Sequence, residues 1–356
     1  MAFYWGLWVF VCFLGCLGLS NAKYSRKVNA VFYVFLVVLA AIIGAREYVG
    51  SDWGSYKQFY EAGYDMTGRD QMEFLFQFIR DTLFKLGFTY GFFSFIIALM
   101  SLTALYKALE LAKINNYWIA FLVYLSMFFC HYQLNVIRHG ALASFVLLAY
   151  VYRANGFTLK GLFCLLIGVG FHKIGLFFLL FYPFINKTIN TKILLLALGI
   201  GLGFFAVGIS RFFTPSITLI SAYLELDGYL DIDRWGTVGL SVGLIGKLFI
   251  FLYAYFFNKE LYESNSIFRT SVNLLLISVV FNLALAQYAV IVERLVNAIS
   301  MSLVIVIPYL ISNTRGQNKY LLSGLFFLYL FLYYPIVWNR EEADMLPFIT
   351  HLSNLF

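Results

Sequence analysis

Charged residues are scarce in this chain. Only 12% of its 356 residues are Asp, Glu, Lys or Arg, which is about half the share in an average globular protein. With 62% hydrophobic residues, a soluble protein of this size would expose too much apolar surface. The composition therefore excludes an ordinary soluble domain and predicts an all-α, polytopic membrane protein.

The motifs of several enzyme classes are also absent. The sequence contains no Walker loop, dinucleotide-binding fingerprint, zinc motif or nucleophile elbow. Its four cysteines lie in apolar runs without a Cys-x-x-Cys pair, which indicates inert thiols. The triplet Asp231-Ile232-Asp233 has the form of a metal motif, but a single triplet in a loop fits a solvated acidic turn. We expect no metal, no cofactor and no nucleic-acid partner.

Apolar runs predict about twelve membrane spans in a single integral membrane domain, residues 1–356. The first run has basic residues after it and none before it, which favours a retained helix over a cleaved signal peptide. The expected spans are 3–19, 28–45, 90–106, 117–132, 139–152, 161–172, 174–186, 193–209, 238–257, 271–290, 296–312 and 320–336.

The charges of the loops predict that both termini lie outside. With this topology the inner loops hold 13 basic residues against three acids, Glu110, Glu260 and Glu263, as the positive-inside rule requires. The basic residues are Lys23, Arg26, Lys27, Lys107, Lys113, Arg153, Lys160, Lys187, Lys192, Lys259, Arg269, Arg315 and Lys319.

The run 161–185 admits two interpretations. As one helix of 25 residues it would be about 37 Å long, and it would place the acidic segment 210–237 inside and the basic loop 258–270 outside. The charge rule favours the alternative, a short hairpin broken near His172 and Lys173.

Two outer segments are too long to be simple turns. In 46–89, apolar residues recur at near-helical spacing between 72 and 88, which predicts an amphipathic helix at the outer interface. The segment 210–237 carries Arg211 and Arg234 among acidic and aromatic residues. We therefore expect the polar chemistry at the outer face.

Two outer carboxylates are candidate catalytic groups. Asp52 follows Gly50, a residue that permits a tight turn, and the ordinary alternative is that it caps the next helix. Glu73 precedes the amphipathic stretch, where a carboxylate also complements the helix dipole. If the two lie close together, one pKa rises and a general base becomes available.

Isolated cationic residues stand at the ends of apolar runs. Arg138 is either a snorkelling side chain or a ligand-binding group, and Arg294 either pairs with Glu293 or binds a ligand. His172 is either a packing group or a group that exchanges protons near neutral pH. Several arginines at one outer face suit a phosphate or pyrophosphate, because guanidinium is planar and bidentate toward its oxygens.

In their order along the chain, these pieces resemble the EpsG/Wzy family of bacterial polysaccharide polymerases. The resemblance covers about residues 45–310 and rests on short motifs: 50–53 with Tyr56, Glu73, 135–143, 170–174, and Glu293-Arg294 before a late span containing Pro308. His139 and Lys173 stand where the family commonly has Gln and a small residue.

The resemblance implies a metal-independent glycosyltransferase with a multi-span, GT-C-like fold in the bacterial cytoplasmic (inner) membrane, acting on its periplasmic side. The implied substrate is an undecaprenyl-pyrophosphate-linked oligosaccharide, and membrane lipid and a chain-length regulator protein are implied partners. In this hypothesis Asp52 or Glu73 is the general base and His172 the second choice. The expected pyrophosphate and glycan ligands are Arg138, Arg294, Arg211, Arg234, Tyr56 and Lys173.

Two other functions remain open at this point. An O-antigen ligase would share the arginine chemistry and differ in its acceptor, and only product analysis separates the two. A flippase would bury cations along a path reachable from both faces, whereas here the mixed charge gathers outside.

Cysteines introduced at Thr188 and Gln317 should be labelled by a membrane-impermeant maleimide only after permeabilisation. Both positions fall in loops that the charge rule places inside. Labelling of either site in cells whose outer face alone is accessible would contradict the predicted topology.

Overall fold

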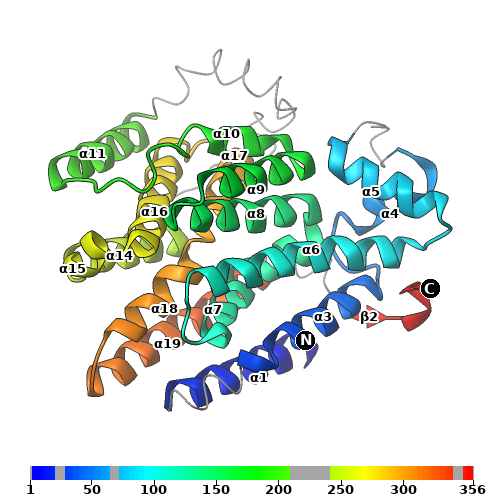
Figure 1. Ribbon diagram of the computed structural model, residues 1–356, viewed down its shortest axis with the longest axis horizontal. Helices are drawn as coiled ribbons and strands as arrows, with labels where there is room; N and C mark the ends of the chain where they lie inside the picture. Colours follow the sequence, from blue (N-terminus) through cyan, green and yellow to red (C-terminus); the bar gives the residue numbers. More distant parts are fainter. Residues whose placement is uncertain (1, 21–28, 65–71, 209–240, 340–347, 356) are drawn as a thin grey trace.

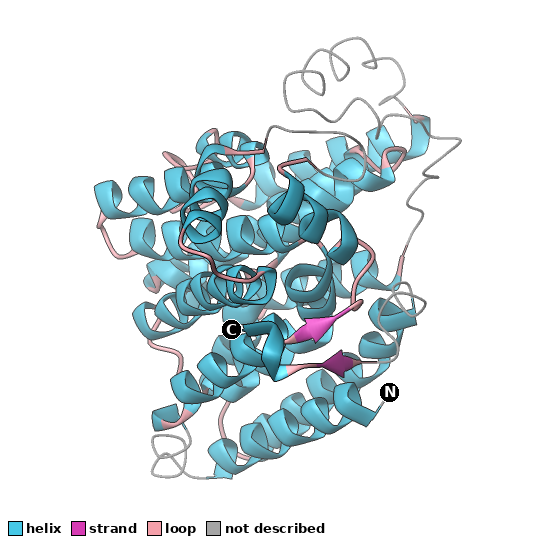
Figure 2. Ribbon diagram, turned by 90° about the vertical axis from the view of Figure 1, so that its right-hand side faces the viewer, coloured by secondary structure: helices cyan, strands magenta, loops and turns pink. Residues whose placement is uncertain are grey.

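The structure is a computed structural model that describes residues 2–20, 29–64, 72–208, 241–339 and 348–355. These residues are almost entirely helical, which confirms the predicted all-α class (Figure 1). A single antiparallel pair of short strands, β1 (Arg46–Glu47) and β2 (Ile349–Thr350), joins the C-terminal segment to the residues that follow the second apolar run (Figure 2).

The longer helices follow the apolar runs of the sequence. They are α1 (Ala2–Ser20), α3 (Phe32–Gly44), α4 (Trp53–Ala62), α5 (Phe74–Lys85), α6 (Tyr90–Leu111), α7 (Tyr117–Tyr124), η1 (Leu125–Asn135), α8 (Ile137–Ala154), α9 (Thr158–Phe171), α11 (Thr191–Val207), α14 (Val242–Phe256), α16 (Ser266–Ala284), α17 (Ala289–Ser300), α18 (Leu303–Asn313) and α19 (Gln317–Asn339). The shorter ones are η2 (Lys173–Gly175), α10 (Leu176–Leu179), α15 (Lys259–Ser264) and η5 (Leu352–Leu355).

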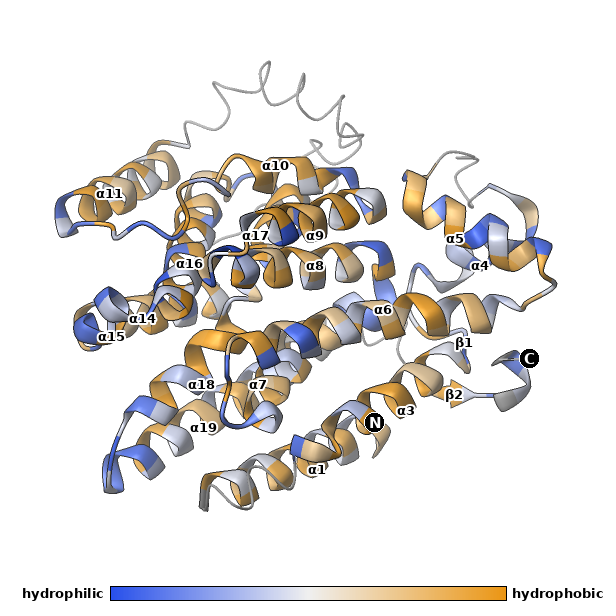
Figure 3. Cartoon of the chain, in the orientation of Figure 1, coloured by the Kyte–Doolittle hydropathy of each residue, from blue (hydrophilic) through white to orange (hydrophobic). Residues whose placement is uncertain are grey.

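Six helical stretches in the described residues are long and apolar enough to cross a membrane. They are 2–19, 90–111, 117–135, 266–284, 291–313 and 317–336, and four shorter apolar helices accompany them. Large hydrophobic side chains such as Val34, Leu196 and Leu321 are more than 60% exposed, as expected for lipid-facing positions. Hydrophobic residues cover most of the long helices in Figure 3. The chain is a multi-pass membrane protein.

The predicted hairpin after α9 is present, with one correction. α9 ends at Phe171, His172 is extended (φ −157°, ψ 121°), and the chain then turns back. The Tyr182 hydroxyl donates to the carbonyl of Thr158 at 2.7 Å, so the returning limb reaches the start of α9. A single 25-residue helix is therefore wrong. The limb expected as the span 174–186 is not a regular α-helix, because it contains only η2, the four-residue α10 and turns.

The centre of the core is the continuous stretch α7–η1–α8. Nearly every residue of α7 and η1 is buried, and most of α8 is buried as well. η1 is a π-helix of 11 residues that ends at Asn135, and α8 starts two residues later. The chain therefore turns sharply at Val136, and Arg138 lies in the first turn of α8, inside the protein.

The segment after α3 forms the cap of this bundle. The amphipathic stretch is helical as predicted: in α5, Phe76 is buried and contacts Phe93, whereas Phe74 is 80% exposed. α4 and α5 lie together at one end of the molecule, near the C-terminal segment (Figure 1). The other expected outer segment, 210–237, lies outside the described residues.

Two glycines allow the cap to approach the core closely. Gly50 has a φ of +100°, and a Cβ there would lie 1.9 Å from the carbonyl oxygen of Leu134. A Cβ on Gly170 would lie 2.8 Å from the Cβ of Leu75. A side chain would fit at neither position. Because glycine has none, the loop before α4 can reach the η1–α8 corner and α5 can pack on the end of α9.

Candidate functional site

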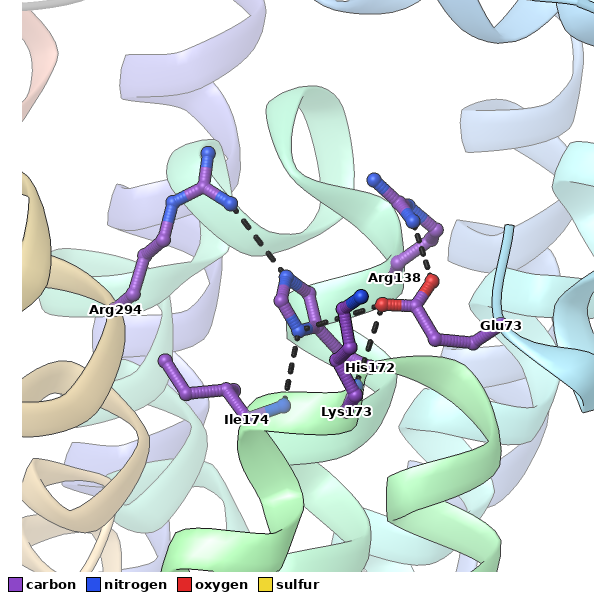
Figure 4. Close-up of polar contacts among 6 residues, drawn as sticks. All are labelled: Glu73, Arg138, His172, Lys173, Ile174 and Arg294. Atoms are coloured by element: carbon purple, nitrogen blue, oxygen red, sulfur yellow. Dashed lines mark hydrogen bonds and ion pairs between the residues drawn. The ribbon is translucent and has the colours of Figure 1, made fainter. Parts of the chain in front are cut away.

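Glu73 joins three separate parts of the fold. It precedes α5, but its side chain makes no capping bond to that helix. Its carboxylate instead accepts hydrogen bonds from Arg138 Nη1 and, at 3.2 Å, from the backbone N–H of Lys173. It also lies 3.6 Å from Nδ1 of His172. Figure 4 shows the three groups directed toward this carboxylate.

Arg138 is buried, with only 9% of the residue exposed. Besides the ion pair with Glu73, its guanidinium lies 5.8 Å from the ring centroid of Tyr56 and 5.7 Å from that of Phe76, distances at which a cation is attracted by the ring face. A snorkelling arginine would extend to solvent, so that alternative is wrong. Burial raises the pKa of Tyr56, and its hydroxyl stays protonated as a hydrogen-bond donor.

His172 links the Glu73–Arg138 pair to Arg294. Its Nε2 lies 3.5 Å from Arg294 Nη1, and since guanidinium only donates, this contact needs the ring proton on Nδ1, beside Glu73. The 3.4 Å contact from the N–H of Ile174 to Nδ1 needs the proton on Nε2. The two contacts require different tautomers, so a neutral ring, here 5% exposed, accepts only one of the two hydrogen bonds at a time.

Arg294 is half-buried on α17 and approaches the cluster from the side opposite Glu73 (Figure 4). The neighbouring Glu293 points elsewhere: its Oε1 lies 3.9 Å from Nδ1 of His131, and it lines a separate cavity with Lys247 and Asn297. Adjacent residues on a helix point about 100° apart, so Arg294 is directed to His172 while Glu293 faces away.

Asp52 is held beside the cluster by Asn135. The hydroxyl of Ser51 donates to Asn135 Oδ1 at 2.5 Å, and the backbone N–H of Asp52 donates to the same oxygen at 3.1 Å. The Asp52 side chain makes no capping bond to α4, so the capping interpretation is wrong. Tyr56, one turn later on α4, contacts Arg138.

The structure thus brings most of the predicted residues together, though not always as expected. Lys173 contributes its backbone N–H to Glu73. Arg211 and Arg234 lie outside the described residues. Two residues were assigned no role from the sequence: Asn135, which positions the Asp52 loop, and the buried His139, whose ring centroid is 5.4 Å from that of His172. Both could have been noticed in the sequence, because each is a polar side chain within an apolar run.

The charges of the cluster favour an anionic ligand. Two guanidinium groups face one carboxylate, and an imidazole lies between them. A cation-binding site would need several carboxylate, carbonyl or imidazole groups directed at one point. The arrangement instead directs two guanidinium groups, those of Arg138 and Arg294, to the Glu73–His172 contact.

A family model describes the chain over most of its length. The model of the EpsG family matches residues 29–350, a range that contains the whole cluster. The chain belongs to the EpsG family. A search of curated proteins found no match, and a search of solved structures found none.

Membership of the EpsG family confirms the resemblance on which the sequence analysis relied. It indicates a polysaccharide polymerase-type, glycosyltransferase-like function in a multi-pass membrane protein. In this EpsG protein, five of the residues that carried the resemblance gather around Glu73: Tyr56, Arg138, His172, Lys173 and Arg294.

The Glu73–Arg138 pair should show strong coupling in a double-mutant cycle of stability. Glu73→Leu and Arg138→Met each leave one buried charge unpaired, so each should lower the free energy of unfolding by about 3–5 kcal/mol. The double variant should lower it by clearly less than the two single variants added together. Thermal unfolding in detergent is the measurement.

The matched control for this cycle is the exposed pair Lys259 and Glu263, whose closest N and O atoms are 3.8 Å apart. Its coupling should stay below about 0.5 kcal/mol. Additive effects at Glu73 and Arg138 would show that the buried ion pair is not a structural link.

Proposed function

We propose that this EpsG family member polymerises polyprenyl-pyrophosphate-linked oligosaccharide units. The growing glycan is the donor, carried on undecaprenyl pyrophosphate, and a hydroxyl of an incoming lipid-linked unit is the nucleophile. A new glycosidic C–O bond forms at the anomeric carbon while its bond to the pyrophosphate oxygen breaks. The hydroxyl proton passes to a base, and undecaprenyl pyrophosphate leaves with the bonding electron pair.

The observation that carries this proposal is the convergence of Arg138 and Arg294 on the two sides of the Glu73–His172 contact. Two fixed guanidinium groups stabilise the negative charge that develops on a leaving pyrophosphate, and they do so without reorganisation at the moment of reaction. Glu73 and His172 hold these groups in place. Arg211, Arg234, Tyr56 and Lys173 are proposed to assist in binding the pyrophosphate or glycan.

Asp52 is the preferred general base in this proposal. Glu73 is the weaker choice, because its carboxylate already accepts from Arg138 and from the N–H of Lys173. Asp52 is held beside the cluster through its backbone N–H, which donates to Asn135 Oδ1. His172 is the second choice, since its Nδ1 lies beside Glu73 and its Nε2 beside Arg294.

The proposed membrane arrangement has about twelve spans in a GT-C-like fold, with the cluster on the periplasmic side of the bacterial cytoplasmic membrane. The 14-residue α9 is about 21 Å long, less than the roughly 30 Å of a bilayer core. With α9 starting at the inner surface, as this arrangement proposes, His172 at its outer end would lie below the outer surface. A lipid-linked pyrophosphate can reach this depth sideways, with its tail still in the bilayer. A chain-length regulator is a proposed partner.

A ligase and a flippase are the competing functions. Deleting the gene for a polymerase should leave glycans that carry single repeat units, whereas loss of a ligase or flippase should leave none. The glycan profile of the deletion strain therefore separates a polymerase from the other two, and a profile without capped single units would contradict the proposal.

Arg138→Lys and Arg294→Lys should each abolish chain extension while the protein stays in the membrane. Lysine keeps the charge but lacks the bidentate fork. The readout is polymer length in the complemented deletion strain, with the exposed Arg315→Lys as the matched control. Full-length polymer from both cluster variants would contradict a pyrophosphate clamp.

Asp52→Asn should lower the turnover rate by about 10²–10⁴-fold while lipid-linked substrate still binds, because the amide keeps the shape of the carboxylate and cannot accept the proton. Polymer formation and substrate binding are measured side by side on the purified variant. Normal turnover of Asp52→Asn with an inactive His172→Ala would move the role of base to the histidine.

A further inference from the structure

A second cavity on the cap is lined by buried donors that have no partner. Nη2 of Arg46, Nε1 of Trp53 and the hydroxyl of Tyr90 are each buried without a hydrogen bond, and the three residues are only 1%, 5% and 7% exposed. All three line one cavity of about 200 Å³, together with Lys57 and Asn354. No role was assigned to this cavity above.

The Arg46 guanidinium is fixed by the backbone around it. Its Nε donates to the carbonyl of Val49 at 3.2 Å, and its Nη1 donates to the carbonyl of Ile43 at 2.7 Å and to Ser94 Oγ at 2.9 Å. Among the described residues no carboxylate lies within 4.0 Å of it to neutralise its charge. The rigid fork therefore presents Nη2 as an unused donor.

Two carboxylates that line the cavity each have a side-chain neighbour. Glu47 Oε2 lies 3.3 Å from Nε2 of His351, and Glu61 Oε1 lies 3.9 Å from the Lys57 amine. That amine also lies 5.1 Å from the ring centroid of Trp53, so a second cation stands beside the unpartnered indole.

The unpartnered donors indicate what chemistry a ligand of this cavity would need. An indole N–H and a guanidinium can only donate, and each buried donor left unsatisfied costs about 1–3 kcal/mol. A ligand that presents several acceptor oxygens and a negative charge has the chemistry that these donors lack. A neutral ligand would leave the buried Arg46 without a counter-charge.

We propose that the Arg46 cavity binds a phosphate group at a site separate from the Arg138–Arg294 clamp. Trp53 and Tyr56 are three residues apart on α4, so this short helix contributes to both sites. A polymerase brings together two lipid pyrophosphates, one on the growing chain and one on the incoming unit. Assigning the Arg46 cavity to the incoming unit rests on the proposed function, whereas the binding of phosphate does not.

The double variant Trp53→Phe/Tyr90→Phe removes one N–H and one hydroxyl that have no partner. Because the buried Trp53 ring contacts Tyr48 and Tyr90, the smaller phenylalanine leaves unfilled space and the unfolding temperature should fall moderately. Tyr90→Phe alone removes one of the two donors and keeps the ring, so it tests the same site at nearly native stability. The purified full-length protein should bind two molecules of undecaprenyl pyrophosphate by native mass spectrometry, and the variant should bind one. The affinity of the lost site should fall about 10- to 100-fold.

Three comparisons make the result decisive. Trp5→Phe/Tyr320→Phe, which changes the same residue types outside the cavity, should still bind two molecules. Arg138→Ala should lose the other site and keep the one at Arg46. The proposal would be overturned by two results together. The native protein would bind only one molecule of undecaprenyl pyrophosphate, and Trp53→Phe/Tyr90→Phe would change neither that binding nor the binding of phosphatidylglycerol.

Phosphatidylglycerol and inorganic pyrophosphate identify the source of the phosphate. If the variant loses phosphatidylglycerol but not undecaprenyl pyrophosphate, the site stands as a headgroup site and its assignment to the incoming unit is wrong. If the variant binds one pyrophosphate-bearing molecule fewer than the native protein, and the native protein forms no polymer, the phosphate site is supported and the proposed polymerase function is wrong.

Discussion

The buried ion pair between Glu73 and Arg138 is the constraint on which the rest of the site depends. Taking two charges out of water costs several kcal/mol per ion, and neither group is more than about a tenth exposed. Their pairing fixes the start of α5 against the first turn of α8. The same carboxylate accepts from the N–H of Lys173 and so holds the break after α9, which places His172 between Glu73 and Arg294.

The sequence predicted the members of the cluster because charge is costly in a chain this apolar. Asp52, Glu73, Arg138, His172 and Arg294 were conspicuous for that reason, and the polar pair at 172–173 correctly predicted a broken helix. Which of them touch was not predictable. Glu73 and Arg138 are 65 residues apart, and the close contact at Gly170, which brings α5 to the end of α9, leaves no mark in the sequence around Glu73.

Other features depend on burial, which a sequence does not display. Arg46 follows an apolar run, where a basic residue normally lies at the membrane surface, yet the C-terminal segment and α6 enclose it. The limb after His172 is as apolar as its neighbours, so its turns could not be distinguished from a helix. Glu293 and Arg294 are adjacent in sequence and point to different sites.

The account predicts a polymerase whose two phosphate sites are both built around the cap formed by α4 and α5. The most direct test is to reconstitute the purified protein in vesicles with lipid-linked repeat units as sole substrate. Polymer should form, with one undecaprenyl pyrophosphate released for each new glycosidic bond. Movement of the lipid-linked unit across the bilayer without bond formation, or transfer only to a different acceptor, would contradict the account.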